Sequence, residues 1–312
     1  MNTMDFKDFT QEVAKMVKEM LPEKCIELQD VIKNNGLVLT GLVIKEKDNP
    51  IAPTIYLNPF YEKYQYGTDL ACIGKEIAEA YNNSKGFPVE GFDIGSLLNF
   101  NKAREQLRFK IINYDKNIKQ YQENPHRKYL DLMVVYYLDV STDKDERGKA
   151  SITVNKHIFD AWGVTEEELF NTALKNTEQA EGVTIVSMVD IMAGFMSENA
   201  GDEEMSIEEQ LDAVGEIPMF VITNQCKMNG AGVILYPDCL QRIKEHLHSN
   251  FYILPSSTHE VIAVPTEYGT GTETQALLSM VREVNEDAVS VEERLSNNIY
   301  CFEDSELKLI TA

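Results

Sequence analysis

Hydrophobic residues recur at helical spacing in several stretches of the chain. From Met4 to Met20 the apolar positions stand three or four residues apart, which predicts an amphipathic helix that ends before Pro22. Thr165, with Glu168 three residues later, predicts the start of another helix through a capping box. The same patterns indicate further helices at 69–81, 115–123, 237–247 and 274–284.

Short apolar or alternating runs between turn-forming residues predict strands. Cys25–Ile32 and Leu37–Ile44 flank Asn35-Gly36, which favours a tight hairpin because both residues tolerate positive φ. Other predicted strands are 54–57, 108–113, 128–140, 151–154, 218–224, 232–236, 251–254, 260–264, 299–302 and 307–310. Strands and helices mixed in this way predict an α+β fold with mixed, largely antiparallel sheets and packed helices.

One order of elements recurs along the chain. Residues 37–64, 132–162 and 219–246 each predict a strand, a polar turn, a second strand and then a helix. These strand-strand-helix units are either diverged copies or the same local physics arising more than once, and the pattern leaves both open.

A strongly acidic window interrupts the pattern. Between Lys175 and Lys227 there is no lysine or arginine, while eleven residues are acidic. Within it, Ser206 and Glu209 predict a second capping box, as Ser290 and Glu293 do further on. We expect an N-terminal α+β half at 1–180, an acidic connecting segment at 181–216 and a C-terminal α+β half at 217–312.

The overall charge narrows the function classes. The 312 residues include 29 Lys and Arg but 51 Asp and Glu, a formal net charge of −22. This charge repels nucleic-acid backbones and anionic lipid, so we expect no direct nucleic-acid binding and no membrane contact. It suits a basic protein partner. A sharper version is a nucleic-acid mimic whose carboxylates imitate phosphates, and the simpler reading is a solubilising acidic face.

Location is predicted from the N-terminus, the apolar runs and the cysteines. Met1–Phe9 has no apolar core typical of a signal peptide. The longest apolar run, Leu132–Leu138, is far shorter than the roughly 20 residues that span a bilayer. Five scattered cysteines without a Cys-x-x-Cys pair indicate free thiols in a reducing cytoplasm. We therefore expect a soluble cytoplasmic protein.

One cluster contains the residue types of a serine hydrolase. Ser256, Ser257, His259 and Glu260 offer a nucleophile, a base and an acid within five residues. Residues so close in sequence rarely converge across a turn, and Pro-Ser-Ser-Thr is itself a favourable turn sequence. The candidates Ser256, Ser257 and His259 are therefore set against a structural reading as a hairpin turn.

A second cluster contains a local concentration of basic residues. His126, Arg127 and Asp131 are candidate binding residues, because an arginine fork can hold a carboxylate or phosphate. These side chains can equally pair with acids of the chain itself. His246 and His248 are better explained by a helix C-terminus than by metal binding. We expect neither a metal nor another cofactor.

Several long strings resemble a known family. NPHRKYLDLMVVYYL, ITVNKHIFDAWGVTEEELF, ILYPDCLQRIKEHLHSNFYILPSSTHEVIAVP and ERLSNNIYCF resemble an uncharacterised domain-of-unknown-function family of gut Clostridia and other Firmicutes. The resemblance covers most of the chain from Ile26 to Phe302. It implies a soluble bacterial protein, often encoded among mobile-element or phage-derived genes, and it transfers no site residues.

These observations favour binding over catalysis. We interpret the chain as a non-enzymatic binding protein with an acidic surface. The alternatives are a hydrolase that uses Ser257 or Ser256 with His259, the nucleic-acid mimic, and a small-ligand sensor with a pocket between the two halves.

Overall fold

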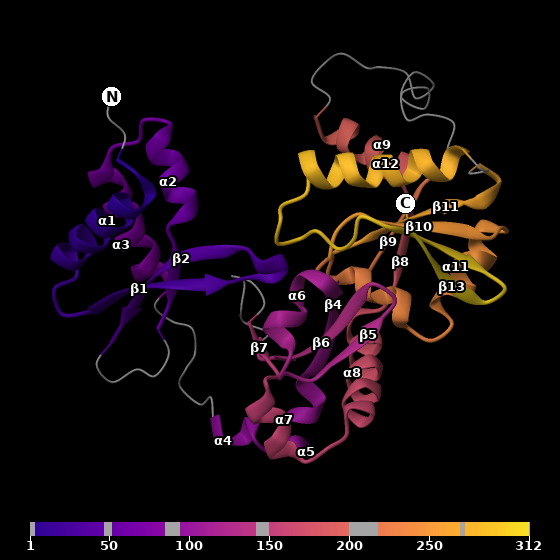
Figure 1. Ribbon diagram of the computed structural model, residues 1–312, viewed down its shortest axis with the longest axis horizontal. Helices are drawn as coiled ribbons and strands as arrows, with labels where there is room; N and C mark the ends of the chain where they lie inside the picture. Colours follow the sequence, from indigo (N-terminus) through magenta and orange to yellow (C-terminus); the bar gives the residue numbers. More distant parts are fainter. Residues whose placement is uncertain are drawn as a thin grey trace. The chain divides into compact units, whose positions relative to one another are not determined.

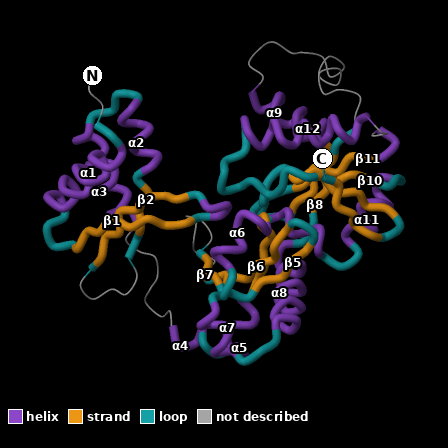
Figure 2. The backbone as a smooth tube through the Cα atoms, in the orientation of Figure 1, coloured by secondary structure: helices purple, strands orange, loops and turns teal. Residues whose placement is uncertain are grey.

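The computed structural model describes residues 4–46, 52–84, 94–141, 150–199, 218–268 and 272–311. The chain forms two compact units, Met1–Ile94 and Gly95–Ala312. Each unit combines helices with antiparallel sheets, so the predicted α+β class is confirmed (Figures 1 and 2).

The first unit is a three-stranded antiparallel sheet with helices. The strands β1 (Cys25–Ile32), β2 (Val38–Lys45) and β3 (Thr54–Tyr56) lie in that order. The helices are α1 (Phe6–Met20), α2 (Asn58–Gln65) and α3 (Leu70–Ser84). In the turn from β1 to β2, Asn35 and Gly36 have φ values of 59° and 73°, as the sequence predicts, but five residues separate the paired Ile32 and Val38.

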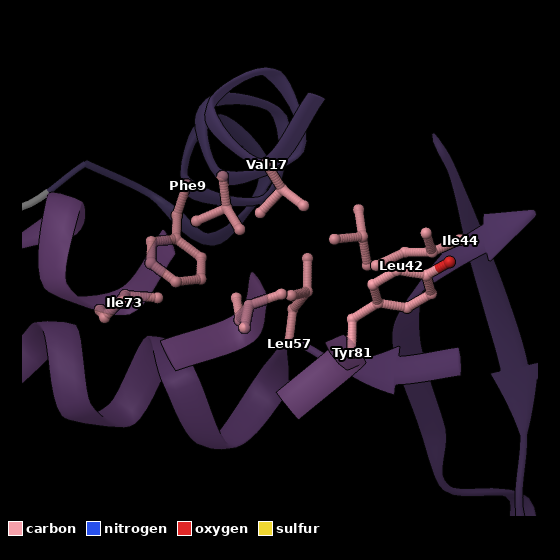
Figure 3. Close-up of a cluster of buried hydrophobic side chains, with 9 residues drawn as sticks. Phe9, Val17, Leu42, Ile44, Leu57, Ile73 and Tyr81 are labelled. Atoms are coloured by element: carbon pink, nitrogen blue, oxygen red, sulfur yellow. The ribbon is translucent and has the colours of Figure 1, made fainter. Parts of the chain in front are cut away.

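A compact apolar core joins the sheet and helices of the first unit. Side chains from α1, β2 and α3 point toward one another in Figure 3, which labels Phe9, Val17, Leu42, Ile44, Leu57, Ile73 and Tyr81. All seven are at most 1% exposed. The phenolic hydroxyl of Tyr81 donates a hydrogen bond of 2.7 Å to Glu46 at the rim of this core. The helical periodicity of Met4–Met20 therefore identifies a real core face.

The second unit begins with a small sheet. Its strands are β4 (Leu107–Asn113), β5 (His126–Tyr129), β6 (Leu132–Asp139) and β7 (Ser151–Thr153), with β6 pairing to the other three. Its helices are α4 (Ile94–Leu97), α5 (Phe100–Ala103), η2 (Arg104–Gln106), α6 (Tyr114–Tyr121), α7 (Lys156–Trp162) and α8 (Glu166–Glu181). Thr165 Oγ1 accepts a hydrogen bond from the Glu168 N–H, which confirms the predicted cap of α8.

A six-stranded antiparallel sheet follows in the same unit. Its order is β13-β12-β10-β11-β9-β8. The strands are β8 (Thr184–Ser187), β9 (Phe220–Thr223), β10 (Phe251–Pro255), β11 (Val261–Pro265), β12 (Ile299–Glu303) and β13 (Glu306–Ile310). The other elements are α9 (Met188–Asn199), η3 (Gly230–Leu235), α11 (Cys239–Leu247), η4 (Thr266–Tyr268) and α12 (Thr272–Asp287), of which α12 packs on the sheet (Figure 1).

Two predicted strands are wrong in an informative way. Residues 128–140 form the hairpin β5–β6 instead of one strand, because Leu130 adopts a left-handed φ of 56°. Residues 232–235 lie in the 3₁₀ segment η3, which Tyr236 follows, and Gly230–Ile234 are buried. A short buried apolar run has the same sequence signature in a strand as in a helical segment. Since η3 replaces a strand, the third recurring unit lacks its second strand, and the recurrence is not confirmed.

Helix starts after residue 205 also differ from the prediction. Asp238 has a left-handed φ of 59° and α11 begins at Cys239, so Pro237 does not open the helix. The Glu293 N–H donates to the Ser290 carbonyl in a turn, and no helix follows this predicted capping box. The other one, Ser206 with Glu209, lies outside the described residues.

The contacts divide the chain at a different place from the one expected. The boundary lies between Ile94 and Gly95, whereas the sequence suggested a connecting segment at 181–216. Two contacts explain this difference. Strand β8, inside the expected segment, pairs with β9 beyond it, and Asn113 Nδ2 of β4 donates a 3.0 Å hydrogen bond to the Leu295 carbonyl oxygen on the other side of that segment. In the described part of the chain, no helix is both long and apolar enough to cross a bilayer.

Candidate functional site

Arg127 lies in β5 and reaches across to the first turn of α8. Its Nε donates to both Glu166 carboxylate oxygens at 3.1 Å, and its Nη2 donates to Oε2 at 2.7 Å. The guanidinium carbon also lies 4.1 Å from the centre of the Phe170 ring. The fork that could hold a ligand carboxylate is therefore occupied by a carboxylate of the chain itself.

The same carboxylate accepts a further hydrogen bond from the Tyr136 hydroxyl of β6. The hydrogen bonds to Glu166 raise the pKa of Arg127 above its ordinary value. Burial, followed by the bond to Glu166, raises the pKa of Tyr136. Arg127 is therefore cationic and Tyr136 protonated at neutral pH, an arrangement that locks β5, β6 and α8 together.

His126 precedes this cluster and makes a separate contact. Its Nδ1 lies 2.9 Å from the Asn124 carbonyl oxygen, and its ring centre lies 6.4 Å from that of Tyr114. These contacts hold the ring beside α6. The structure therefore gives His126 and Arg127 different partners, although the residues are adjacent in sequence.

Asp131 forms a second polar centre at the β5–β6 turn. Its Oδ2 accepts hydrogen bonds from Ser296 Oγ at 2.6 Å and from Asn298 Nδ2 at 2.9 Å. Its Oδ1 accepts one from the Tyr300 hydroxyl at 2.7 Å. Tyr300 is fully buried, and burial, followed by the negative charge of Asp131, raises its pKa. One carboxylate thus ties the small sheet to β12 of the large sheet.

The serine and histidine candidates form a turn between β10 and β11. Ser257 Oγ accepts a hydrogen bond from the His259 backbone N–H at 3.0 Å, and Ser256 Oγ donates to Glu260 at 3.3 Å. The His259 ring is held elsewhere. Its Nδ1 accepts from the Asn229 N–H at 3.1 Å, and its Nε2 lies 3.5 Å from Glu293 Oε1.

These bonds determine what the turn can do chemically. Because Nδ1 accepts a hydrogen bond, a neutral His259 ring carries its proton on Nε2, facing Glu293. Neither ring nitrogen of His259 is hydrogen-bonded to a hydroxyl of Ser256 or Ser257, the contact through which a base activates a serine nucleophile. The geometry instead attaches the turn to the segments before η3 and before β12.

One buried carboxylate of the acidic window could not be predicted from the sequence. Glu181, the last residue of α8, is 3% exposed and accepts a 2.6 Å hydrogen bond from Asn224 Nδ2. Burial, with Glu181 as the next cause, raises the pKa of Tyr236. Hydrophobic alternation and helical periodicity cannot predict that Glu181 and Tyr236 interact, because these two residues lie 55 positions apart along the chain.

The partners of Arg127 and Asp131 were also missed, although the sequence contained a signal for them. Glu166 lies in the string WGVTEEEL, while Ser296, Asn298 and Tyr300 lie in ERLSNNIYCF. The family-like strings therefore meet in space. Among the described residues, no group of three His, Cys, Asp or Glu side chains could hold a metal ion.

The comparisons with known proteins agree with the resemblance of these strings. The model of a family of unknown function (DUF5688) matches residues 6–304. Neither a curated protein nor a solved structure matches the chain. A bacterial source and a setting among mobile-element genes stay predictions. Since the match spans nearly the whole chain, the protein belongs to this family of unknown function.

Proposed function

We propose that the protein acts by binding a basic protein partner through the outer half of the β1–β2 hairpin, the part that bears Leu28, Ile32 and Val38. Directly paired residues of an antiparallel hairpin share one face. Ile26 pairs with the buried core residue Ile44, and Leu28 pairs with the buried core residue Leu42, so Ile26 and Leu28 lie on the core face of the sheet. This alignment makes the hairpin a continuation of the core face.

The apolar face continues beyond the buried core. Leu28 is 39% exposed, and the pair formed by Ile32 and Val38 is 55% and 51% exposed. Large apolar side chains gathered on one surface are typical of protein contacts. This exposed apolar face is the observation that carries the proposal.

The charge on the same face indicates the partner's chemistry. Asp30 lies between Leu28 and Ile32 on this face, and its Oδ1 accepts a 2.7 Å hydrogen bond from Thr40 Oγ1. A partner with apolar side chains and a lysine or arginine opposite Asp30 complements this pattern. The net charge of −22 adds long-range attraction for such a partner.

The proposed setting is the reducing cytoplasm. All five cysteines are free thiols, which suits that compartment. Nucleic-acid mimicry remains the sharper version of the acidic-surface proposal, although seven of the eleven acids in the acidic window lie outside the described residues. A hydrolase stays an alternative. It requires that a serine-directed phosphonate probe label the wild type and that His259→Ala lose this labelling.

Capture from cell lysate by the immobilised full-length protein tests the proposal at low and high salt. We expect a basic protein to bind the wild type at low salt and to be lost with Leu28→Thr/Val38→Thr. Asp30→Asn should weaken capture by about tenfold, the value of one charge-assisted contact. Met280→Thr/Val284→Thr and Glu283→Gln are matched controls, because these exposed side chains lie on α12 of the other unit.

Comparing the hairpin variants with the control variants shows whether the captured protein binds the proposed surface. A protein retained equally by the hairpin and control variants contradicts the proposed surface, as does a captured protein without net positive charge. The molar mass in solution provides a second measurement. If the wild type is a dimer that Leu28→Thr/Val38→Thr converts to a monomer, the occupant of the face is a second copy and the proposal is wrong.

A further inference from the structure

Three basic side chains of the second unit surround a hollow on the outer side of α8. Arg104 comes from η2, Arg108 from β4 and Lys175 from α8. We call this space, of about 740 Å³, the cationic hollow. Asn176, Gln179 and a single acid, Glu105, also line it. The charged lining therefore sums to +2 in a protein of net charge −22.

Some basic residues of the protein are paired with acids. Lys24 pairs with Glu46, and Lys156 pairs with Asp160. No ion pair of Arg104, Arg108 or Lys175 occurs among the described residues. In so acidic a chain, three cations without acidic partners at one place leave positive charge available to an anion.

The backbone around the cationic hollow is held in place. Asn176 Nδ2 donates to the carbonyl oxygens of Arg104 at 2.6 Å and of Leu107 at 3.1 Å, which joins α8 to η2 and β4. Arg108 Nη1 donates to the carbonyl oxygens of Glu105 and Leu107 at 2.7 and 3.0 Å. Its Nε is buried without a hydrogen-bond partner, so the chain's own acceptors leave part of this guanidinium unused.

A second hollow of about 650 Å³ adjoins the first and shares Arg104, Lys175 and Asn176 with it. We call it the polar hollow. Its remaining lining is polar, and includes Glu167, Glu168, Asn171 and Thr172. Carboxylates, amides and hydroxyls bind the hydroxyl groups of a ligand, whereas the two carboxylates repel a second anionic group.

We propose that the two hollows bind a small phosphorylated sugar, with its phosphate in the cationic hollow and its hydroxyl groups in the polar hollow. A phosphate presents three oxygens to donors that arrive from three elements, while a carboxylate presents two oxygens in one plane. Both hollows fall within the usual size of small-molecule sites. The charge of the whole molecule opposes the binding of an extended nucleic acid.

Calorimetric titration of the full-length protein with ribose 5-phosphate, inorganic phosphate and ribose tests the proposal in phosphate-free buffer at low salt. We expect ribose 5-phosphate to bind more tightly than phosphate, and ribose to give no measurable heat. Arg104→Gln/Lys175→Gln should weaken ribose 5-phosphate by at least about tenfold. Arg282→Gln/Lys119→Gln removes the same charge from exposed positions elsewhere and should change binding by less than about twofold.

Asn171→Ala tests the polar hollow separately. It should weaken ribose 5-phosphate and leave inorganic phosphate unchanged. Circular dichroism establishes that each variant is folded. The proposal is overturned if neither phosphate compound binds, if both double variants weaken binding equally, or if ribose 5-phosphate binds no better than phosphate. These residues lie outside the β1–β2 hairpin, so this result is independent of the proposed partner surface.

Discussion

At the scale of single residues, polar side chains connect elements that are distant in sequence. Asp131 receives three hydrogen bonds from the segment 296–300, and it follows Leu130, whose φ of 56° is unfavourable for a branched side chain. The bonds to Asp131 stabilise a turn in which Leu130 has an unfavourable backbone conformation. His259 has a similar part, since its ring and backbone attach the β10–β11 turn to Asn229 and Thr223.

Asp131→Ala should lower the free energy of unfolding by about 2–3 kcal/mol, because the fully buried Tyr300 hydroxyl loses its acceptor. The double variant with Tyr300→Phe should show a coupling of about 1–2 kcal/mol in a mutant cycle. Urea denaturation measures each variant. Glu283→Ala, an exposed carboxylate on α12, is the control and should change stability by less than about 0.5 kcal/mol. Additive effects of Asp131→Ala and Tyr300→Phe would contradict this reading.

At the scale of elements, α8 organises the part of the second unit that bears the candidate residues. Its first turn provides Glu166 for Arg127, and Thr177, about three turns later on the buried side, accepts a hydrogen bond from β4. The opposite side of the helix faces solvent and lines the cationic and polar hollows through Asn171 and Lys175. One helix therefore carries both a structural face and the proposed ligand face.

Arg127→Lys should destabilise this arrangement by about 1–2 kcal/mol, since a lysine cannot make the two parallel bonds to Glu166 or stack on Phe170 in the same way. Chemical denaturation measures the change. Arg282→Lys on α12 is the matched control, because Arg282 is exposed and has no ion pair among the described residues. Equal stability of Arg127→Lys and Arg282→Lys would show that the contact with Glu166 has no net value.

Elements with a regular pattern were predictable, and those defined by tertiary contacts were not. The apolar spacing of Met4–Met20 predicts α1 nearly to the residue, and the cap at Thr165 predicts where α8 begins. The turn at Leu130 has no glycine or asparagine to mark it, so the break between β5 and β6 had no local signal. For the same reason the sequence identified Arg127 and Asp131 as unusual but left their partners open.

At the scale of the whole molecule, each candidate surface belongs to one of the two compact units. The first unit has its own core, formed by α1, β2 and α3. The second unit contains Trp162, the single tryptophan of the chain. Its indole Nε1 donates a 2.6 Å hydrogen bond to the Leu97 carbonyl, and its ring lies 5.3 Å from that of Phe100. Tryptophan fluorescence therefore reports on the second unit.

Because each unit has its own core, we expect the units to respond separately to core substitutions. Ile77→Ala removes a fully buried side chain of the first unit and should cost about 2–5 kcal/mol there. The far-ultraviolet circular dichroism transition should then begin at lower urea, while the fluorescence transition of Trp162 keeps its midpoint. Ile111→Ala, equally buried in β4 of the second unit, should shift the fluorescence transition instead. A common shift of both signals in both variants would mean that the chain unfolds as one cooperative body, because a cavity in either core would then destabilise the whole molecule.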